Sequence, residues 1–212
     1  MNQTKLLVLL LVMVLLIGGA WVLYENYGDS YQPDVLTPPV TDDTTPPVTD
    51  DTTPAVTDDT TPAPETTDPD AFKAPGFTVL DGEGNTVSLA DMRGKPVILN
   101  LWASWCPPCK AELPDFDAAY EKYGDTIHFM MVDLTDGYQE TVEKAKSFIA
   151  DAGYTFPVYF DTESEAAIAY NATSIPATYF IDAEGNLVVY AHGMLDAANL
   201  QKGIDMLLET LE

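Results

Sequence analysis

The sequence predicts an α/β domain at residues 71–212, preceded by an apolar segment and an acidic linker. Three observations support this division. An uninterrupted apolar run occupies residues 6–23, a repetitive stretch rich in Asp, Thr and Pro occupies residues 28–70, and the remaining sequence alternates between strand-like and helix-like patterns. Such alternation is typical of a largely parallel sheet that is covered by helices.

Residues 1–27 are predicted to be a membrane anchor. Their apolar run has 18 residues, which is just long enough to cross the hydrocarbon core of a bilayer as a helix. Lys5 precedes the run and acidic residues follow it, so the charges favour a cytoplasmic N-terminus and a single-pass topology. The alternative is a cleaved signal peptide, since Gly18 and Ala20 are small enough for the positions before a cleavage site. Both interpretations place the following domain outside the cytoplasm.

Residues 28–70 are predicted to be a disordered linker. They contain eleven Asp or Glu residues, no Lys or Arg, and three nearly identical octads that begin at Val40, Val48 and Val56. Proline favours the extended polyproline II conformation and like charges repel, so this composition cannot bury a core. At about 3.1 Å per residue the segment would span at most roughly 130 Å. It is therefore expected to act as a spacer.

The charge of residues 71–212 excludes one class of partner. This region contains 22 acidic and eight basic residues, an excess of 14 negative charges. Such a surface is repelled by phosphate backbones, whereas nucleic-acid-binding proteins carry basic patches. We therefore expect no nucleic-acid partner.

The helices and strands predicted within residues 71–212 follow an α/β order. A β-hairpin is followed by strand, helix, strand, helix, strand and helix, and then by a second hairpin and a last helix. This order implies a crossover between parallel strands and an antiparallel end. Pro114 is expected to kink its helix because proline lacks an N–H. The predicted ranges are 75–80, 86–89, 96–103, 107–123, 127–134, 138–152, 158–160, 163–170, 178–181, 187–191 and 196–211.

The most specific chemical signal is the tetrapeptide Cys106-Pro107-Pro108-Cys109, which contains the only two cysteines of the chain. Two cysteines with this spacing at the start of a helix can close a disulfide and reopen it. At the junction of strand and helix, unpaired N–H groups and the helix dipole would stabilise the Cys106 thiolate, which makes it the expected nucleophile. Cys109 would resolve the mixed disulfide. No cofactor beyond this redox-active disulfide is expected.

Two stretches resemble the membrane-tethered TlpA/ResA branch of the thioredoxin family. The first runs from Val87 to Pro114 and contains Ala-Ser-Trp-Cys-Pro-Pro-Cys-Lys, and the second is Ser-Ile-Pro-Ala-Thr-Tyr-Phe-Ile-Asp at residues 174–182. The resemblance covers about residues 72–212. It implies a thioredoxin-like fold with an added N-terminal hairpin, and a thiol-disulfide oxidoreductase that acts outside the cytoplasm as a reductant.

The resemblance also implies an acid and base for the dithiol. Thioredoxin has a buried aspartate six residues before its first cysteine, but here that residue is Asn100, which cannot ionise. Glu112 lies three residues after Cys109, on the same face of the predicted helix, and resembles the active-site glutamate of the ResA-like branch. We expect Glu112 to donate and accept the proton. The alternative is a solvated glutamate on the helix surface.

Four residues are expected to contact the substrate: Trp105, Pro107, Ile175 and Pro176. Pro176 stands where the family has a cis-proline loop, and the Ile175 backbone could pair with an extended substrate. Trp105 is expected to be partly exposed, and Trp102 to lie in the core. The implied partners are a membrane thiol donor and oxidised exported proteins, with apocytochrome c and methionine sulfoxide reductases as candidates.

Three alternative functions remain open at this point. A thiol peroxidase would need Pro and Thr or Ser where the chain has Leu99 and Ala103. A copper chaperone could use His128 or His192 with the cysteines, but such chaperones have three residues between their cysteines, so no metal site is expected. A non-catalytic adaptor would use the disulfide only as a staple, although so short a closed loop adds little stability.

Overall fold

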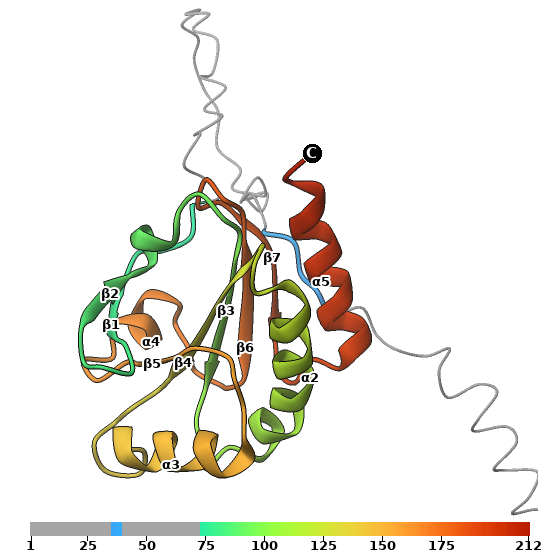
Figure 1. Cartoon of the computed structure of the whole chain (residues 1–212). Helices are drawn as coiled ribbons and strands as arrows, with labels where there is room; N and C mark the ends of the chain where they lie inside the picture. The colour runs from blue at the N-terminus through green and yellow to red at the C-terminus, as the bar shows by residue number, and fades with distance from the viewer. Residues whose placement is uncertain (1–34, 40–72) are drawn as a thin grey trace, which may run out of the picture. The chain divides into compact units, whose positions relative to one another are not determined.

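The computed structural model describes residues 35–39 and 73–212, so the predicted anchor and most of the predicted linker lie outside the described residues. The described residues belong to one compact unit. It is built on a seven-stranded sheet with the strand order β2-β1-β5-β4-β3-β6-β7 (Figure 1). Within the described ranges, no helix is long and apolar enough to cross a bilayer.

The elements follow the order that the sequence predicts, with one addition. The addition is the 3-10 helix η2, which begins after Ser88 because Ser88 and Asp91 cap each other reciprocally. The bounds are β1 Thr78–Leu80, β2 Thr86–Ser88, η2 Leu89–Met92, β3 Val97–Trp102, α2 Pro107–Tyr123, β4 His128–Asp133, α3 Val142–Ala152, β5 Val158–Phe160, α4 Glu165–Ala169, β6 Ala177–Ile181, β7 Leu187–His192 and α5 Ala197–Glu209.

The strand pairing confirms the predicted α/β arrangement. The central strand β3 pairs parallel with β4 and antiparallel with β6, while β5 extends the parallel part beyond β4. β6 and β7 form the predicted antiparallel end, and the N-terminal hairpin of β1 and β2 joins the opposite edge through β5. Because parallel strands end at the same edge, the carboxyl ends of β3 and β4 lie side by side.

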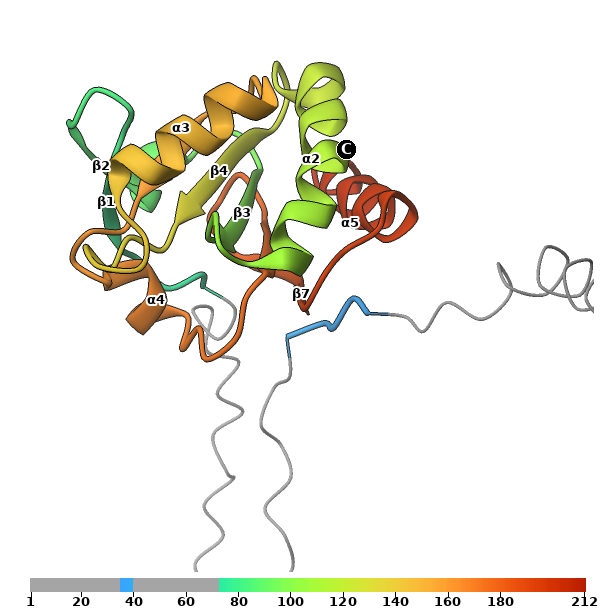
Figure 2. The ribbon, with the colours of Figure 1, turned by 90° about the horizontal axis from the view of Figure 1, so that it is seen from below.

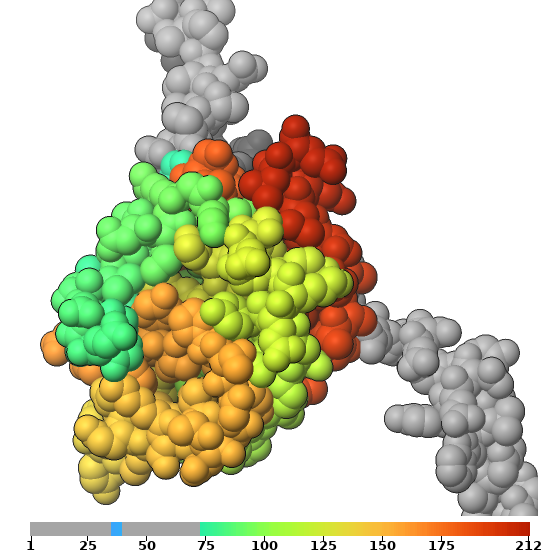
Figure 3. Space-filling view, in the orientation of Figure 1, coloured from blue at the N-terminus to red at the C-terminus, as the bar shows by residue number. Residues whose placement is uncertain are grey.

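Helices cover both faces of the sheet. Ile98 and Trp102 of β3 belong to the core cluster beneath α2, α3 and α5, whereas Leu99 and Leu101 belong to the cluster beneath α4 and η2. This alternation is the two-residue period of a strand that is buried on both faces. Figure 2 shows α2 and α3 on one side of β3 and β4 with α4 on the other side. The space-filling view shows α2, α3 and α5 closing over their face (Figure 3).

The helix α2 runs from Pro107 to Tyr123 and continues through Pro114, so the helix does not end at the proline. Proline removes only its own hydrogen bond to the preceding turn. The neighbouring side chains of Leu113 and Phe116 are fully buried, so packing on the sheet supports the helix on both sides of the proline. Tertiary contact therefore outweighs the local preference.

Gly203 of α5 packs closely against Phe180 of β6. A Cβ atom at this position would lie 2.2 Å from Cζ of the fully buried Phe180. We expect Gly203→Ala to lower the free energy of unfolding by about 3 kcal/mol, because the ring has no free space to move into. Urea unfolding measures this loss. Gly82→Ala, where no atom lies within 4 Å, is the control, and equal effects of the two substitutions would contradict the packing argument.

Five residues of the predicted linker lie against the sheet. Thr37 pairs antiparallel with Tyr190 of β7: the Thr37 N–H donates to the Tyr190 carbonyl at 2.7 Å, and the Tyr190 N–H donates to the Thr37 carbonyl at 2.9 Å. Val35 and Leu36 are partly buried against the core. Residues 35–39 thus differ from the disordered linker that the composition of residues 28–70 predicts, because Thr37 pairs with β7 and the two residues before it pack on the core.

Candidate functional site

The cysteines lie where β3 ends and α2 begins. Cys106 and Cys109 form a disulfide with a Cα–Cα distance of 5.3 Å. Cys106 is the N-cap of α2, and its Sγ accepts a hydrogen bond from the Cys109 N–H at 3.2 Å. Pro107 and Pro108 occupy the first helical turn, where no intrahelical donor is needed. The positive end of the helix dipole therefore points at the sulfur of Cys106.

The two cysteines differ in their access to the surface. A cavity of about 420 Å³ opens beside the disulfide, and Cys106 lines it whereas Cys109 does not. Cys106 is 2% exposed and Cys109 is fully buried. A thiol that enters the cavity would therefore meet Cys106 first. The other lining residues are Trp105, Pro107, Pro108, Leu134, Ala172, Thr173, Ser174 and Ile175.

The loop before β6 forms the opposite wall of this cavity. The peptide bond between Ile175 and Pro176 is cis, as the family resemblance implies. The Ile175 carbonyl oxygen lies 3.7 Å from Cys106 Sγ, and the Gly193 N–H donates to the Pro176 carbonyl at 2.8 Å. The loop thus presents the backbone of Ile175 directly beside the disulfide.

The structure brings together three of the four residues expected to contact the substrate. Trp105, Pro107 and Ile175 line the cavity, while Pro176 is buried behind Ile175 and does not. Trp105 is 46% exposed and Trp102 is fully buried, which confirms the positions predicted for the two tryptophans.

Glu112 lies on α2 and is fully buried, so the alternative of a solvated surface glutamate is wrong. Its Oε1 accepts from Asn100 Nδ2 at 2.8 Å, and its Oε2 accepts from the Leu195 N–H at 2.8 Å. Asn100 also donates to Thr178 Oγ1 at 3.0 Å. Asn100 of β3 and Leu195 in the loop before α5 therefore hold the carboxyl group of Glu112, and Thr178 of β6 orients Asn100.

Burial raises the pKa of Glu112 from its ordinary value to about 7. The hydrogen bonds from Leu195 and Asn100 act in the opposite direction, and the charge of Asp115 adds to the rise. A carboxyl group with a pKa near 7 can both release and accept a proton under physiological conditions. Glu112 lies three residues after Cys109 on α2, so such a group is available one helical turn beyond the dithiol.

A second buried acidic group supports the turn before Cys106, and the sequence pattern did not reveal it. Glu140 is fully buried and accepts hydrogen bonds from Ser104, from the N–H at 2.8 Å and from Oγ at 2.7 Å. Ser104 precedes Cys106 by two residues, so Glu140 fixes the backbone that leads into the site. Nothing near Glu140 in the sequence marks this contact, since the two residues are 36 positions apart.

Asp133 at the end of β4 is the neighbouring buried acid. Its Oδ1 accepts from Thr135 Oγ1 at 2.7 Å, and its Oδ2 has no partner among the described residues. Burial raises the pKa of Asp133 to about 8, and the negative charges of Glu140 and Asp136 add to this rise. Its place at the end of an apolar strand is the signal that sequence analysis could have used.

Asp133 is expected to make the fold less stable as the pH rises from 4 to 8. In this window the unfolded chain has lost the proton that the folded chain still holds, because the folded pKa is the higher one, so stability falls with pH. Asp133→Asn should therefore flatten the pH dependence of the unfolding midpoint. Asp125→Asn, at the surface, is the control. An unchanged slope in Asp133→Asn would contradict a protonated Asp133.

The two histidines do not join the cysteines in a metal site. His128 pairs with Val97 at the start of β3, which is the end opposite the cysteines. His192 pairs with Ala177, and its ring contacts those of Tyr179 and Tyr190. Among the residues that the structure describes, no group of three or more His, Cys, Asp or Glu side chains could hold a metal ion.

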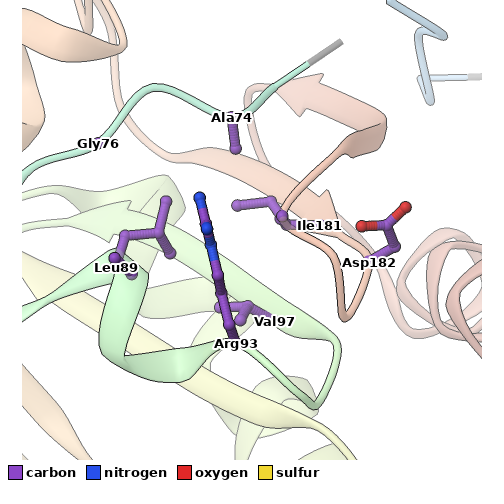
Figure 4. A pocket seen from close by; sticks show the side chains of 9 residues that line it. Ala74, Gly76, Leu89, Arg93, Val97, Ile181 and Asp182 are labelled. Carbon is purple, nitrogen blue, oxygen red and sulfur yellow. The ribbon is translucent and has the colours of Figure 1, made fainter. Parts of the chain in front are cut away.

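A second, smaller cavity of about 100 Å³ lies at the end of the sheet opposite the cysteines. Figure 4 shows the side chain of Arg93 between Leu89 and Ile181 in this cavity. Val97, the first residue of β3, and Ala74 also line it. Arg93 and Asp182 are its charged lining residues, and no cysteine lines it.

Curated relatives share sequence across the domain. The chain is 30% identical to the thioredoxin-like protein YneN of Bacillus subtilis over 134 residues, which are 63% of this chain and 78% of that protein. It is 34% identical to the thiol-disulfide oxidoreductase ResA of Bacillus anthracis over 117 residues, 55% of this chain. The match spans 65% of ResA, just under two thirds of its length.

Solved structures share the fold. A structure from Chlorobium tepidum, named as a thiol:disulfide interchange protein DsbE, superposes with a TM-score of 0.57 at 28% identity. The match covers 64% of this chain and 96% of that one. An exposed lipoprotein thioredoxin from Streptococcus pneumoniae superposes with a TM-score of 0.54 at 32% identity. The match covers 61% of this chain and 98% of that one. These matches confirm the thioredoxin-like fold with its added hairpin. The family model of AhpC/TSA matches residues 71–190, more than half of the sequence, and the chain therefore belongs to the AhpC/TSA family.

Proposed function

We propose that this protein is a membrane-anchored, extracytoplasmic thiol-disulfide oxidoreductase that reduces disulfides in exported proteins. The observation that carries the proposal is the Cys106–Cys109 disulfide at the start of α2, with only Cys106 lining the surface cavity. The similarity to ResA of Bacillus anthracis, a thiol-disulfide oxidoreductase by name, supports the same chemistry.

The reduction proceeds in two exchange steps. The Cys106 thiolate attacks one sulfur of the substrate disulfide, which forms a mixed disulfide and releases the other substrate sulfur as a thiolate that takes a proton from water. Glu112 then accepts the proton of the Cys109 thiol, and the Cys109 thiolate attacks Cys106 Sγ. This step closes the Cys106–Cys109 disulfide and releases the second substrate thiolate, so two electrons pass to the substrate. A membrane dithiol donor restores both thiols.

Substrate binding is assigned to the cavity wall. An extended substrate segment would pair with the Ile175 backbone in β fashion, and Trp105 and Pro107 would contact its apolar side chains. Recognition through the backbone suits unfolded proteins that carry a disulfide between nearby cysteines. Apocytochrome c and methionine sulfoxide reductases are the candidate substrates, and the similarity to a protein named as a thiol:disulfide interchange protein supports disulfide interchange as the reaction.

The location outside the cytoplasm rests on sequence and similarity together. Residues 1–27 would anchor the chain, and residues 28–70 would separate the anchor from the domain at residues 71–212. A similar structure belongs to a protein named an exposed lipoprotein.

Single-turnover exchange tests the proposal. The full chain in detergent micelles is reduced, freed from reductant and mixed with one equivalent of oxidised insulin, and both partners are alkylated and weighed by mass spectrometry. We expect Cys106 and Cys109 to become protected as insulin thiols appear. Consumption of added hydrogen peroxide without any electron transfer to insulin would instead support the peroxidase alternative, and no reaction with either would support the adaptor.

A further inference from the structure

Residues 35–39, which precede the acidic repeats in the sequence, lie along β7, the edge strand of the sheet. The pairing of Thr37 with Tyr190 is antiparallel. Val35 therefore lies toward His192, the last residue of β7, and Pro39 lies toward Leu187, its first residue. Figure 1 shows the segment beside β7.

The sequence of this segment suits an added edge strand. Val35-Leu36 is the only adjacent pair of Val, Leu or Ile residues between positions 28 and 72, and both side chains are partly buried against the core. Thr37 makes both backbone hydrogen bonds of the pair, and Pro38 and Pro39 end the pairing because they lack an N–H. The segment also covers an edge that would otherwise be free to pair with another chain.

The chain returns to β7 at its opposite end. Lys73 pairs with Asn186, and the Ala74 N–H donates to the Gly185 carbonyl at 3.0 Å. Residues 40–72, which contain the acidic repeats, thus begin and end on the same domain. While residues 35–39 are docked, the repeats do not contribute to the length of chain between the anchor and the domain.

The two attachment points lie at opposite ends of the sheet. His192 pairs with Ala177, which follows Pro176, and the Gly193 N–H donates to the Pro176 carbonyl. The Val35 end of the docked segment is therefore on the Cys106 side. Ala74 instead lines the small cavity with Arg93, at the end of the sheet remote from the cysteines (Figure 4).

We infer that the β7 edge is a docking surface for residues 35–39, and that this contact attaches the domain to the membrane by its Cys106 end through a short segment. The inference rests on the proposed membrane anchor. With the segment docked, residues 24–34 span at most about 34 Å at the same rise per residue as the linker. Released, residues 24–72 span at most about 150 Å and enter the domain at the opposite end. Docking thus favours exchange with a thiol donor at the bilayer, and release favours distant substrates.

A probe held at the bilayer surface tests this inference. The full chain is reconstituted in phosphatidylcholine vesicles and reduced, and alkylation of Cys106 is timed with a maleimide on a lipid headgroup and with a soluble maleimide. In the double variant Val35→Asp, Leu36→Asp, we expect the ratio of the two rates to fall roughly ninefold, because effective concentration falls with about the −3/2 power of tether length. The control Val48→Asp, Val56→Asp adds the same charges within the repeats and should leave the ratio unchanged.

Amide hydrogen exchange on the same samples separates the possible outcomes. Protection of the Thr37 and Tyr190 amides in the wild type, lost in the double variant, supports docking. An unprotected Thr37 amide in the wild type would overturn the inference, as would a rate ratio that stays constant when docking is lost. A chain that is not retained on the vesicles would overturn the anchor and the inference together. Failure of Cys106 to exchange with soluble thiols would instead overturn the proposed function.

Discussion

Replacing Cys106 by serine is expected to abolish disulfide exchange, whereas replacing Cys109 by serine is expected to trap the mixed disulfide. Cys106 lines the cavity and receives the Cys109 N–H bond, so it is the sulfur that a substrate can reach and that the helix stabilises as a thiolate. Without it, the rate of insulin reduction should fall by at least about a thousandfold, since loss of the nucleophile removes the covalent pathway. Stopped-flow assays of the full chain measure this loss.

The Cys109→Ser variant is the matched comparison, because it removes the other sulfur of the same disulfide. It should still attack the substrate disulfide and then stop, so a covalent adduct at Cys106 should appear in non-reducing gels. The Cys106→Ser variant could form an adduct only through Cys109. If it did so as fast as Cys109→Ser forms one through Cys106, the assigned order of attack would be contradicted.

Replacing Glu112 by glutamine is expected to slow the resolving step by about a hundredfold and to remove its pH dependence near 7. The carboxyl group with a pKa of about 7 is the proposed acceptor for the Cys109 proton, and general base catalysis is typically worth a factor of this size. Glutamine has nearly the same shape, and Asn100 Oδ1, which has no partner among the described residues, could turn to accept from the new amide. The decay of the mixed disulfide as a function of pH measures the effect.

Glu112→Gln is expected to be more stable than the wild type at pH 8, whereas at pH 4 the substitution should bring no such gain. Because the folded pKa of Glu112 is raised, its favourable contribution is present below pH 4.5 and is lost as the pH rises through 7. A rise of this size corresponds to a loss on the order of 3 kcal/mol, which a neutral glutamine does not incur. Glu121→Gln, at an exposed position of the same helix, is the control. Identical pH profiles in Glu112→Gln and wild type would contradict the proton-transfer role.

The sequence predicts the cysteine site well because the signals there are local. The strand, the helix that follows it and the Cys-Pro-Pro-Cys spacing lie within one stretch, and the helix is found with the predicted limits of 107–123. The spacing of Glu112 from Cys109 predicts which face it occupies. Its burial depends on Leu195, 83 positions away, and such a distant partner leaves no trace in the local pattern.

The differences from the sequence predictions arise where distant segments meet. Glu140 is linked to Ser104 across 36 positions, and Thr37 pairs with a strand more than 150 residues further along the chain. The composition of residues 28–70 is dominated by Asp, Thr and Pro, and an average over that stretch conceals the two adjacent apolar residues at 35 and 36. The docking of these two apolar residues can be predicted only when the position of β7 at the edge of the sheet is known.

The reduction potential of the Cys106–Cys109 couple tests the central claim most directly. The full chain in detergent micelles is equilibrated with thiol redox buffers of defined poise, and the fraction of free thiols is read by alkylation. A reductase should have a midpoint near or below about −270 mV, the value of thioredoxin. A midpoint near about −120 mV, typical of strong oxidants, would reverse the direction of electron flow, and a pair that forms no disulfide at any poise would contradict the redox function itself.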